Sequence, residues 1–173
     1  MNTVGFRLLG PTEMFVDGQS APLPSGAERA LLVLLLLSAG RTIPATTLID
    51  RLWSESSLPI DPMNALQIRV SKLRRALASY GGELVTRERV GYRINVEPSA
   101  IDAERFVEMV RGARERANAA AGKYTDADLE LFDDALALWA GDPLSDFVTE
   151  PWAMAEAARL NELRLAAVTE RTQ

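Results

Sequence analysis

The stretch from Asn64 to Arg93 gathers the side chains of this sequence that are best suited to bind another molecule. It holds seven lysines and arginines against two acidic residues, although the whole chain carries a net charge of −5. Guanidinium, ammonium, amide and hydroxyl groups bind phosphates and base edges, so the stretch indicates a polyanion as its ligand. A solvated helix face would carry the same charges, and the charge count favours neither interpretation.

The order of residues in Asn64–Leu77 separates two faces of a predicted helix. With a period of about 3.6 residues, Leu66, Val70, Leu73 and Leu77 form one narrow apolar stripe, which predicts a core-facing side. The opposite face carries Asn64, Gln67, Ile68, Ser71, Lys72 and Arg75, and Arg69 and Arg74 flank the stripe. These groups can read base edges or hold phosphates, and Ile68 can touch a thymine methyl group. A lone exposed isoleucine is also common on protein surfaces.

A hairpin is predicted directly after this helix. Two β-rich runs, Leu84–Arg87 and Tyr92–Val96, flank a turn near Val90-Gly91. The cationic side chains of the hairpin are Arg87, Arg89 and Arg93. We place Glu88 at the tip, where an acid weakens any grip on a nucleic acid.

The elements that must position the basic helix lie before it. Val4–Val16 predicts two short strands around Gly10-Pro11, and Asp17-Gly18 predicts a second turn. A third strand is expected over Ala21–Leu23. Ser25, with Glu28 as a capping-box partner, predicts the start of a buried helix that runs to about Ala39 and stops at Gly40.

A second helix is predicted over Ala45–Ser54, after an extended Thr42–Pro44. Pro59 and Pro62 exclude helix from the loop that follows. Three helices, of which the third is basic, followed by a hairpin form the element order of a winged helix. The N-terminal half is therefore expected to be an α+β winged helix.

A domain boundary is expected at Glu97-Pro98-Ser99, giving domains 1–97 and 98–173. Residues 1–97 carry 11 basic and 9 acidic residues, a net of +2, whereas residues 98–173 carry 8 and 15, a net of −7. The second domain shows only helix signals, over 102–121, 126–140 and 151–171. Helix pairs of this size resemble TPR-like repeat units, so we expect an all-α domain.

The last predicted helix has an apolar stripe that needs a packing partner. Its members are Met154, Ala157, Leu160, Leu163 and Ala167. Either the stripe packs on the two preceding helices, or another chain or a continuation of the protein covers it.

No pattern in the chain indicates catalysis, a cofactor or a metal. The chain has no cysteine and no histidine, which excludes disulfides and thiolate metal sites and removes the commonest general base. The carboxylates at Asp133-Asp134 and at Asp142, Asp146 and Glu150 suit helix caps and solvated charges, and there is no Gly-rich phosphate loop. The apolar run Ala30–Gly40 is shorter than the about 20 residues that span a bilayer. We expect a cytoplasmic protein that is not an enzyme, has no cofactor and does not bind membranes.

Several motifs resemble those of known bacterial regulators. SKLRRAL followed by GYRINV is similar to the third helix and wing of the OmpR-type winged helix. FRLLGPTEMFVDG, ERALLVLLLLSAGR and NALQIRVSKLRRAL resemble more narrowly the Streptomyces antibiotic regulatory protein (SARP) family. IDAERF, ALALWAGDPLSDF and EPWAMAEAARLNELRLAAV resemble the bacterial transcriptional activator domain that follows the winged helix there. The resemblance covers nearly the whole chain, and the order of the two domains is more specific than either motif alone.

The resemblance implies a transcriptional activator located at the nucleoid. Such a protein binds direct repeats in double-stranded DNA near a promoter, associates with itself there, recruits RNA polymerase holoenzyme and regulates secondary-metabolite (antibiotic) genes. It places Ile68 at a thymine contact, Lys72 at a base contact, and Arg74 and Arg75 at phosphate or groove contacts. The expected DNA-binding residues are Asn64, Gln67, Ile68, Ser71, Lys72, Arg74, Arg75, Arg87, Arg89, Tyr92 and Arg93.

Two departures from the family pattern bear on this expectation. Ala27-Glu28 stands where many relatives carry Lys-Gln, which puts a phosphate contact there in doubt. Glu88 stands at a wing position that is often arginine, so the minor-groove contact would pass to Arg87 or Arg89. The competing function is a helical protein-interaction module, in which the acidic domain binds a basic partner and DNA binding is accessory.

Overall fold

The computed structural model describes residues 2–172 and divides them into two compact units. The first unit holds the chain up to Gly5 together with Glu13–Pro98, and the second holds Phe6–Thr12 together with the chain from Ser99 onward. The chain therefore passes between the units three times. The sequence predicted one passage, at residues 97 and 98, because no composition change marks the short segment Phe6–Thr12.

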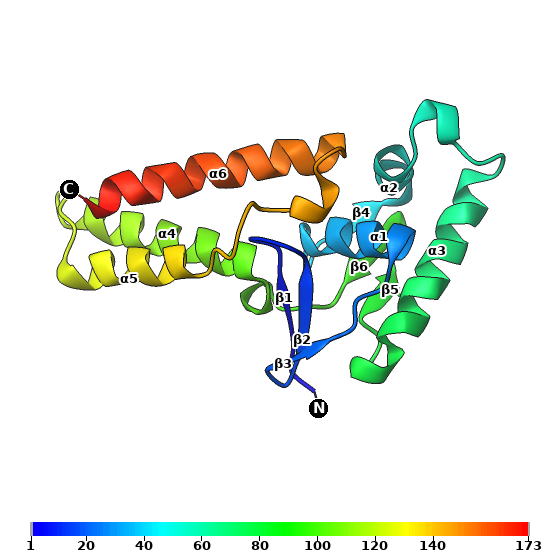
Figure 1. The fold of residues 1–173 in the computed structure, drawn as a ribbon, viewed down its shortest axis with the longest axis horizontal. Coiled ribbons are helices and arrows are strands. Elements are labelled where there is room, and N and C mark those ends of the chain that lie inside the picture. Colours follow the sequence, from blue (N-terminus) through cyan, green and yellow to red (C-terminus); the bar gives the residue numbers. More distant parts are fainter. Residues whose placement is uncertain (1, 173) are drawn as a thin grey trace. The chain divides into compact units, whose positions relative to one another are not determined.

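The first unit has the strands and helices of a winged helix (Figure 1). Its strands are β1 (Val4–Arg7), β2 (Glu13–Val16), β3 (Gln19–Ala21), β4 (Ile43–Pro44), β5 (Val85–Arg87) and β6 (Gly91–Ile94). Strand β1 begins in this unit and continues into the second unit at Phe6. Its helices are α1 (Gly26–Leu36), α2 (Ala45–Leu52) and α3 (Pro62–Leu77), with short 3-10 turns η1 (Glu55–Ser57) and η2 (Ala78–Tyr80). The expected α+β class is confirmed.

The strands form two small sheets, in the orders β1-β2-β3 and β4-β6-β5. Strands β2 and β3 are antiparallel, with Val16 opposite Gln19, so Asp17 and Gly18 alone make the turn. Both turn residues have positive φ, 51° and 80°, which is the conformation that an Asp-Gly hairpin turn requires. The third strand lies two residues earlier than predicted, because this tight turn begins the return at once.

Helix α1 is the core of the first unit, because all six residues Leu31–Leu36 are buried. It ends at Leu36, three residues before the predicted end, and the chain then turns so that Gly40 N–H donates to the Ile94 carbonyl of β6. Ser25 holds the N-cap position, but its side chain makes no capping hydrogen bond. The predicted capping box is therefore wrong.

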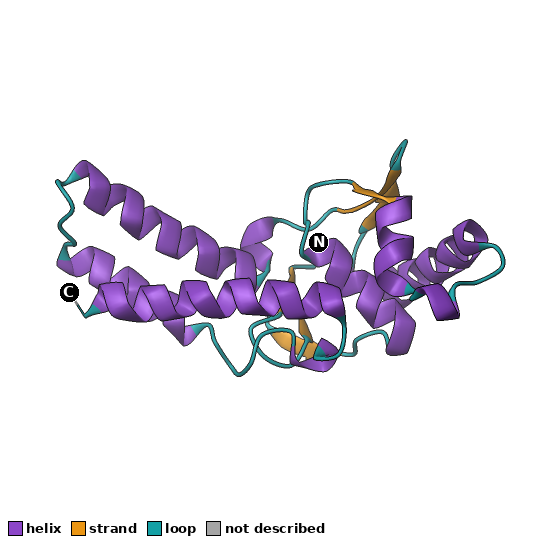
Figure 2. Ribbon diagram, turned by 90° about the horizontal axis from the view of Figure 1, so that it is seen from above, coloured by secondary structure: helices purple, strands orange, loops and turns teal. Residues whose placement is uncertain are grey.

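The second unit is built on three long helices, α4 (Asp102–Ala119), α5 (Asp126–Ala137) and α6 (Pro151–Arg171) (Figure 2). Two 3-10 turns, η3 (Pro98–Ala100) and η4 (Ser145–Phe147), lie before and between them. Each long helix packs against the other two. The all-α prediction is confirmed, with α4 and α5 slightly shorter than expected. Within residues 2–172, no helix combines the length and the apolar content needed to cross a membrane.

The apolar stripe of α6 packs on the preceding helices. Leu160 and Ala167 are fully buried, and Ala157 and Leu163 are half-buried. Only Met154 of the predicted stripe is exposed, at 56%. A separate row that includes Leu165 and Val168 faces outward.

A buried carboxylate holds the segment Phe6–Thr12, which we call the N-terminal strap, in the second unit. Asp102 accepts hydrogen bonds from the backbone N–H groups of Leu8 (2.6 Å), Leu9 (3.0 Å) and Ala103 (2.7 Å). Burial raises the pKa of Asp102, and these backbone donors partly offset the rise. The strap carbonyls are also used, since Ala140 N–H donates to Leu9 and Leu144 N–H donates to Leu8. The strap is thus an integral strand-like part of the helical unit.

Candidate nucleic-acid interface

Helix α3 begins two residues before the predicted start. Asp61 caps it by accepting a hydrogen bond from Asn64 N–H at 3.0 Å, and Pro62 occupies the first helical position. The prediction that Pro62 excludes helix was wrong, because the first turn of a helix needs no N–H donor from that residue. The cap fixes where the helix starts, and so it fixes which side chains point outward.

The two faces predicted for α3 are confirmed by burial. Leu66, Val70, Leu73 and Leu77 are at most 2% exposed, so they hold the helix against the core. The outward row consists of Asn64, Gln67, Ile68, Ser71, Lys72 and Arg75, all of which are exposed. Ile68 is 49% exposed, so an apolar surface lies among polar neighbours. The row offers amide, hydroxyl, cationic and methyl groups to one ligand surface.

Arg74 does not belong to this free surface. Its Nε donates to the Val85 carbonyl of β5 at 2.9 Å, and its Nη2 lies 3.9 Å from a Glu83 carboxylate oxygen. The guanidinium therefore ties α3 to the hairpin. The hydrogen bond to Val85 gives Arg74 a positioning role, and its expected phosphate contact stays a prediction.

The hairpin tip is formed by Arg89 and Val90. Arg87 pairs with Tyr92, and Glu88 N–H donates to the Gly91 carbonyl at 2.8 Å. Glu88 therefore belongs to the last hydrogen-bonded pair of the hairpin, one residue before the tip and not at the tip as predicted. Arg87 and Arg89 are exposed, and Val90 is 61% exposed. The tip presents a cation and an apolar side chain.

Two of the predicted wing residues are less exposed than Arg87 and Arg89. Tyr92 is 5% exposed, because β6 lies between β4 and β5 and the Tyr92 ring packs inward. Arg93 is half-buried, and its Nε is buried without a hydrogen-bond partner among residues 2–172. We assign Tyr92 to the core of the wing.

The sequence did not single out a pairing between Arg69 and Trp53. The Arg69 guanidinium lies 4.2 Å from the centroid of the Trp53 ring, at the end of α2. Both residues line a groove of about 310 Å³ that also touches Ile68 and Lys72 of the outward row. No local pattern joins these two residues, because they come from different helices.

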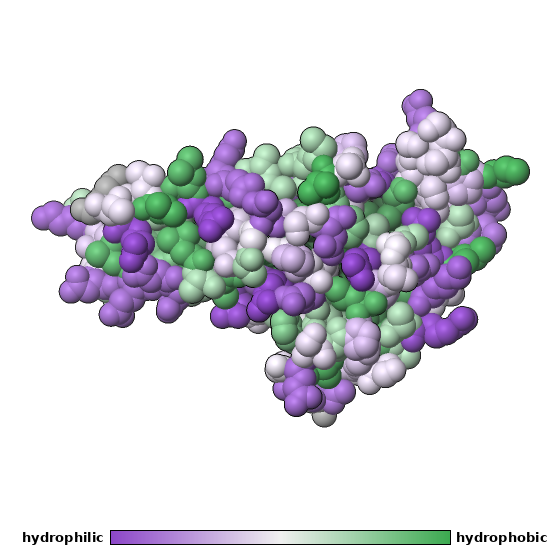
Figure 3. Space-filling model, in the orientation of Figure 1, coloured by the Kyte–Doolittle hydropathy of each residue, from purple (hydrophilic) through white to green (hydrophobic). Residues whose placement is uncertain are grey.

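A second surface without a predicted role spans the loop before α3 and the first turn of α3. Leu58, Ile60 and Met63 are 48%, 107% and 45% exposed. Figure 3 shows apolar side chains at the outer end of this loop. Three large apolar side chains are thus exposed within six positions of the chain.

Within residues 2–172, no group of three acidic side chains is arranged to hold a metal ion. The chemistry available is hydrogen bonding, charge and apolar contact.

Two family models match the chain, and they meet near residue 98, where the chain passes from the first unit to the second for the last time. Residues 19–94 match the model of the C-terminal domain of transcriptional regulatory proteins. Residues 101–173 match the model of the bacterial transcriptional activator domain.

Curated relatives align with the chain across both of these regions. Regulatory protein AfsR of Streptomyces coelicolor is 37% identical over 161 residues, which are 92% of this chain and 15% of that protein. Transcriptional regulatory protein EmbR of Mycobacterium tuberculosis is 35% identical over 87% of this chain and 39% of its own length. Transcriptional regulator RedD of Streptomyces coelicolor is 28% identical over 96% of this chain and 48% of its own length. The chain spans less than half the length of these relatives.

A solved structure shows the same arrangement of elements. Mycobacterium tuberculosis EmbR, in complex with a low affinity phosphopeptide, superposes with a TM-score of 0.87 and 27% sequence identity, covering 98% of this chain and 44% of that one. With a winged helix followed by a bacterial transcriptional activator domain, the chain belongs to the SARP family of transcriptional regulators.

Proposed function

We propose that this chain is the DNA-binding and activating part of a transcriptional activator. The observation that carries the proposal is the outward row of α3, in which Gln67, Lys72 and their neighbours offer base-reading groups on a helix whose other face is buried. An α-helix fits the major groove of B-DNA, and the exposed arginines of the adjoining hairpin suit the neighbouring backbone or minor groove. The proposal keeps all the expected DNA-binding residues. Among them, Arg74 and Tyr92 contribute mainly by holding the helix and the hairpin in place.

The proposed partners are double-stranded DNA and RNA polymerase holoenzyme. Protomers would bind direct repeats about one helical turn apart, side by side on one face of the duplex. The exposed surface formed by Leu58, Ile60 and Met63 suits an apolar contact with the polymerase, since it lies outside the outward row. The proposed targets are promoters of secondary-metabolite (antibiotic) genes on the nucleoid.

The alternative is a protein-interaction module with accessory DNA binding. Leu165 and Val168 favour it, since these α6 residues are 68% and 43% exposed in a helical unit of acidic balance. The two proposals differ in whether the chain selects a DNA sequence.

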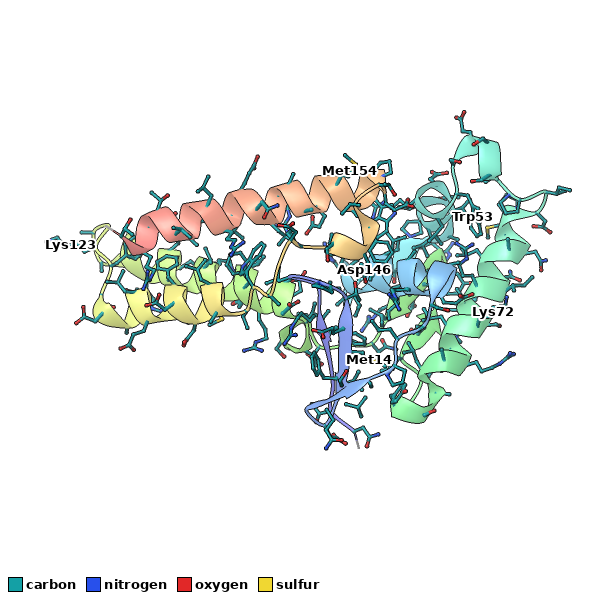
Figure 4. All side chains as sticks on the ribbon, in the orientation of Figure 1. Met14, Trp53, Lys72, Lys123, Asp146 and Met154 are labelled. Atoms are coloured by element: carbon teal, nitrogen blue, oxygen red, sulfur yellow. The ribbon has the colours of Figure 1, made fainter. Side chains whose placement is uncertain are left out.

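Selection of bound duplexes from a randomised library tests the proposal. The wild-type chain should enrich a repeated motif, and Lys72→Ala should lose the preference at one base position, by roughly 1 to 3 kcal/mol of discrimination. Lys123→Ala is the matched control, because Lys123 is the only other lysine and lies exposed in the α4–α5 loop (Figure 4). Transcription by purified holoenzyme from a promoter with the selected motif should rise with wild type and not with Lys72→Ala. A wild-type chain that enriches no motif at low salt would rule the proposal out and favour the interaction module.

A further inference from the structure

Arg69 lies on α3 between the buried stripe and the outward row, and its charge is poorly compensated. Its guanidinium stacks 4.2 Å from the Trp53 ring centroid, yet among residues 2–172 none of its N–H groups has a hydrogen-bond acceptor. Burial lowers the pKa of Arg69, and the nearby charge of Glu28 partly offsets that effect. A guanidinium that has lost water without gaining an acceptor gains from binding an anion.

The groove beside Arg69 opens onto the proposed DNA-reading face. Trp53 comes from the end of α2, and Lys72 comes from α3 (Figure 4). Between them, Pro59 and Ile68 supply apolar walls and Glu28 supplies the one acid of the groove. A ligand that touches Ile68 and Lys72 therefore lies next to Arg69.

Stacking on Trp53 prepares Arg69 to bind an anion through two of its oxygens. The indole face restricts the rotamers of the side chain and leaves the edge of the guanidinium free. That edge carries donors in a fork that matches two oxygens of a phosphate. A lysine at this position would keep the charge but could neither stack in the same way nor bind in a bidentate manner.

We infer that Arg69, stacked on Trp53, binds a phosphate of the DNA backbone beside the groove read by α3, and that Glu28 opposes this contact. The acid repels the phosphates of every duplex, so it lowers the affinity of the chain for all DNA sequences alike. This inference rests on the proposed function, because it requires α3 to lie on DNA.

Binding of the full chain to a labelled mixed-sequence duplex, across about 50 to 200 mM salt, tests this inference. Arg69→Met should weaken binding about tenfold and reduce the slope of log affinity against log salt by about 0.9. Arg69→Lys should keep the slope and recover only part of the affinity. Glu28→Gln should strengthen binding roughly threefold. Arg111→Met is the matched control, since Arg111 is an exposed α4 residue whose loss should leave the slope unchanged.

The results separate this inference from the proposed function. If Arg69→Met lowers the melting temperature but leaves affinity and salt slope at wild-type values, Arg69 only packs on Trp53 and the inference is wrong. The wild type would still bind, and Lys72→Ala would still change its preference. If the wild type binds no duplex, both the proposed function and the inference are overturned.

Discussion

Two neighbouring arginines of the basic helix α3 have different structural surroundings. Arg74 and Arg75 are neighbours in sequence, but Arg75 is exposed whereas Arg74 donates its Nε–H to the Val85 carbonyl. The hydrogen bond to β5 fixes the hairpin against α3. The contact with Glu83, at 3.9 Å between partly exposed side chains, adds little to it.

Substitution of these two arginines by methionine should separate the tasks. Arg74→Met should lower the free energy of unfolding by about 1 kcal/mol, because the carbonyl of Val85 loses its charged donor. It should also weaken DNA binding, since the wing is no longer held. Arg75→Met should weaken DNA binding without changing stability. Urea unfolding and duplex titration of both variants measure the difference, and equal stability of the two would contradict the positioning role.

The sequence predicted which α3 side chains are exposed, but not what the exposed groups touch. The 3.6-residue period placed Lys72 and Ile68 outward because one apolar stripe settles the rotation of a helix. The partners of Arg74, Arg69 and Tyr92 lie on other elements, at distances along the chain that no local pattern encodes. Whether the outward row contacts bases stays a prediction.

The wing depends on a close approach between two strands. Gly91 of β6 lies opposite Pro44 of β4, and a β-carbon added there would lie 1.8 Å from the Ile43 carbonyl oxygen. The backbone of Gly91 has no positive φ, so glycine is required here for space and not for conformation. Strand β4 can therefore close the sheet on β6 only because position 91 has no side chain.

Gly91→Ala should destabilise the winged-helix unit by about 2 to 3 kcal/mol, because a backbone carbonyl cannot move away as a side chain can. Gly112→Ala is the control, since its added β-carbon would meet only the end of Arg116 at 3.8 Å in the middle of α4. That change should stabilise the chain by roughly 0.5 to 1 kcal/mol. Thermal unfolding followed by circular dichroism measures both. A melting temperature of Gly91→Ala at or above wild type would show that β4 and β6 do not need this approach.

Most elements were predicted from the sequence, and the errors have local causes. Helix α6 has the predicted bounds, and the hairpin strands match within two residues, because apolar periodicity and turn residues mark them. The start of α3 was missed because a proline permitted at the first turn looks like a helix breaker. Strand β4 has only two residues, and its pairing with β6 is a tertiary contact.

At the scale of the whole molecule, the strap belongs to the helical unit, although the residues on both sides of it in the sequence belong to the winged-helix unit. The chain enters the helical unit at Phe6, leaves it after Thr12 and returns after Pro98. Inside that unit Phe6, Leu8 and Leu9 are at most 3% exposed. The strap is therefore held by burial as well as by Asp102.

A fragment ending at Pro98 should consequently keep apolar residues that have lost their partners. We expect fragment 1–98 to bind the dye ANS and to aggregate more readily than the full chain, and Leu8→Ser with Leu9→Ser should reduce both effects. In the full chain the same pair of changes should destabilise the helical unit by several kcal/mol, since both side chains are fully buried. A fragment 1–98 that is soluble and does not bind ANS would show that other residues bury the apolar side chains of the strap.

The strap also determines the order in which parts of this protein can fold during its synthesis. Leu8 leaves the ribosome 94 residues before Asp102, the residue whose carboxylate receives its N–H. At about 5 to 20 residues per second, that interval is roughly 5 to 19 s. During this interval, Leu8 and Leu9 are apolar residues next to a nascent winged helix, and the helices that will bury them have not been made. A segment translated before the helices on which it packs is thus among the last to reach its place, and a chaperone that shields short apolar segments would act on this chain before its helical unit exists.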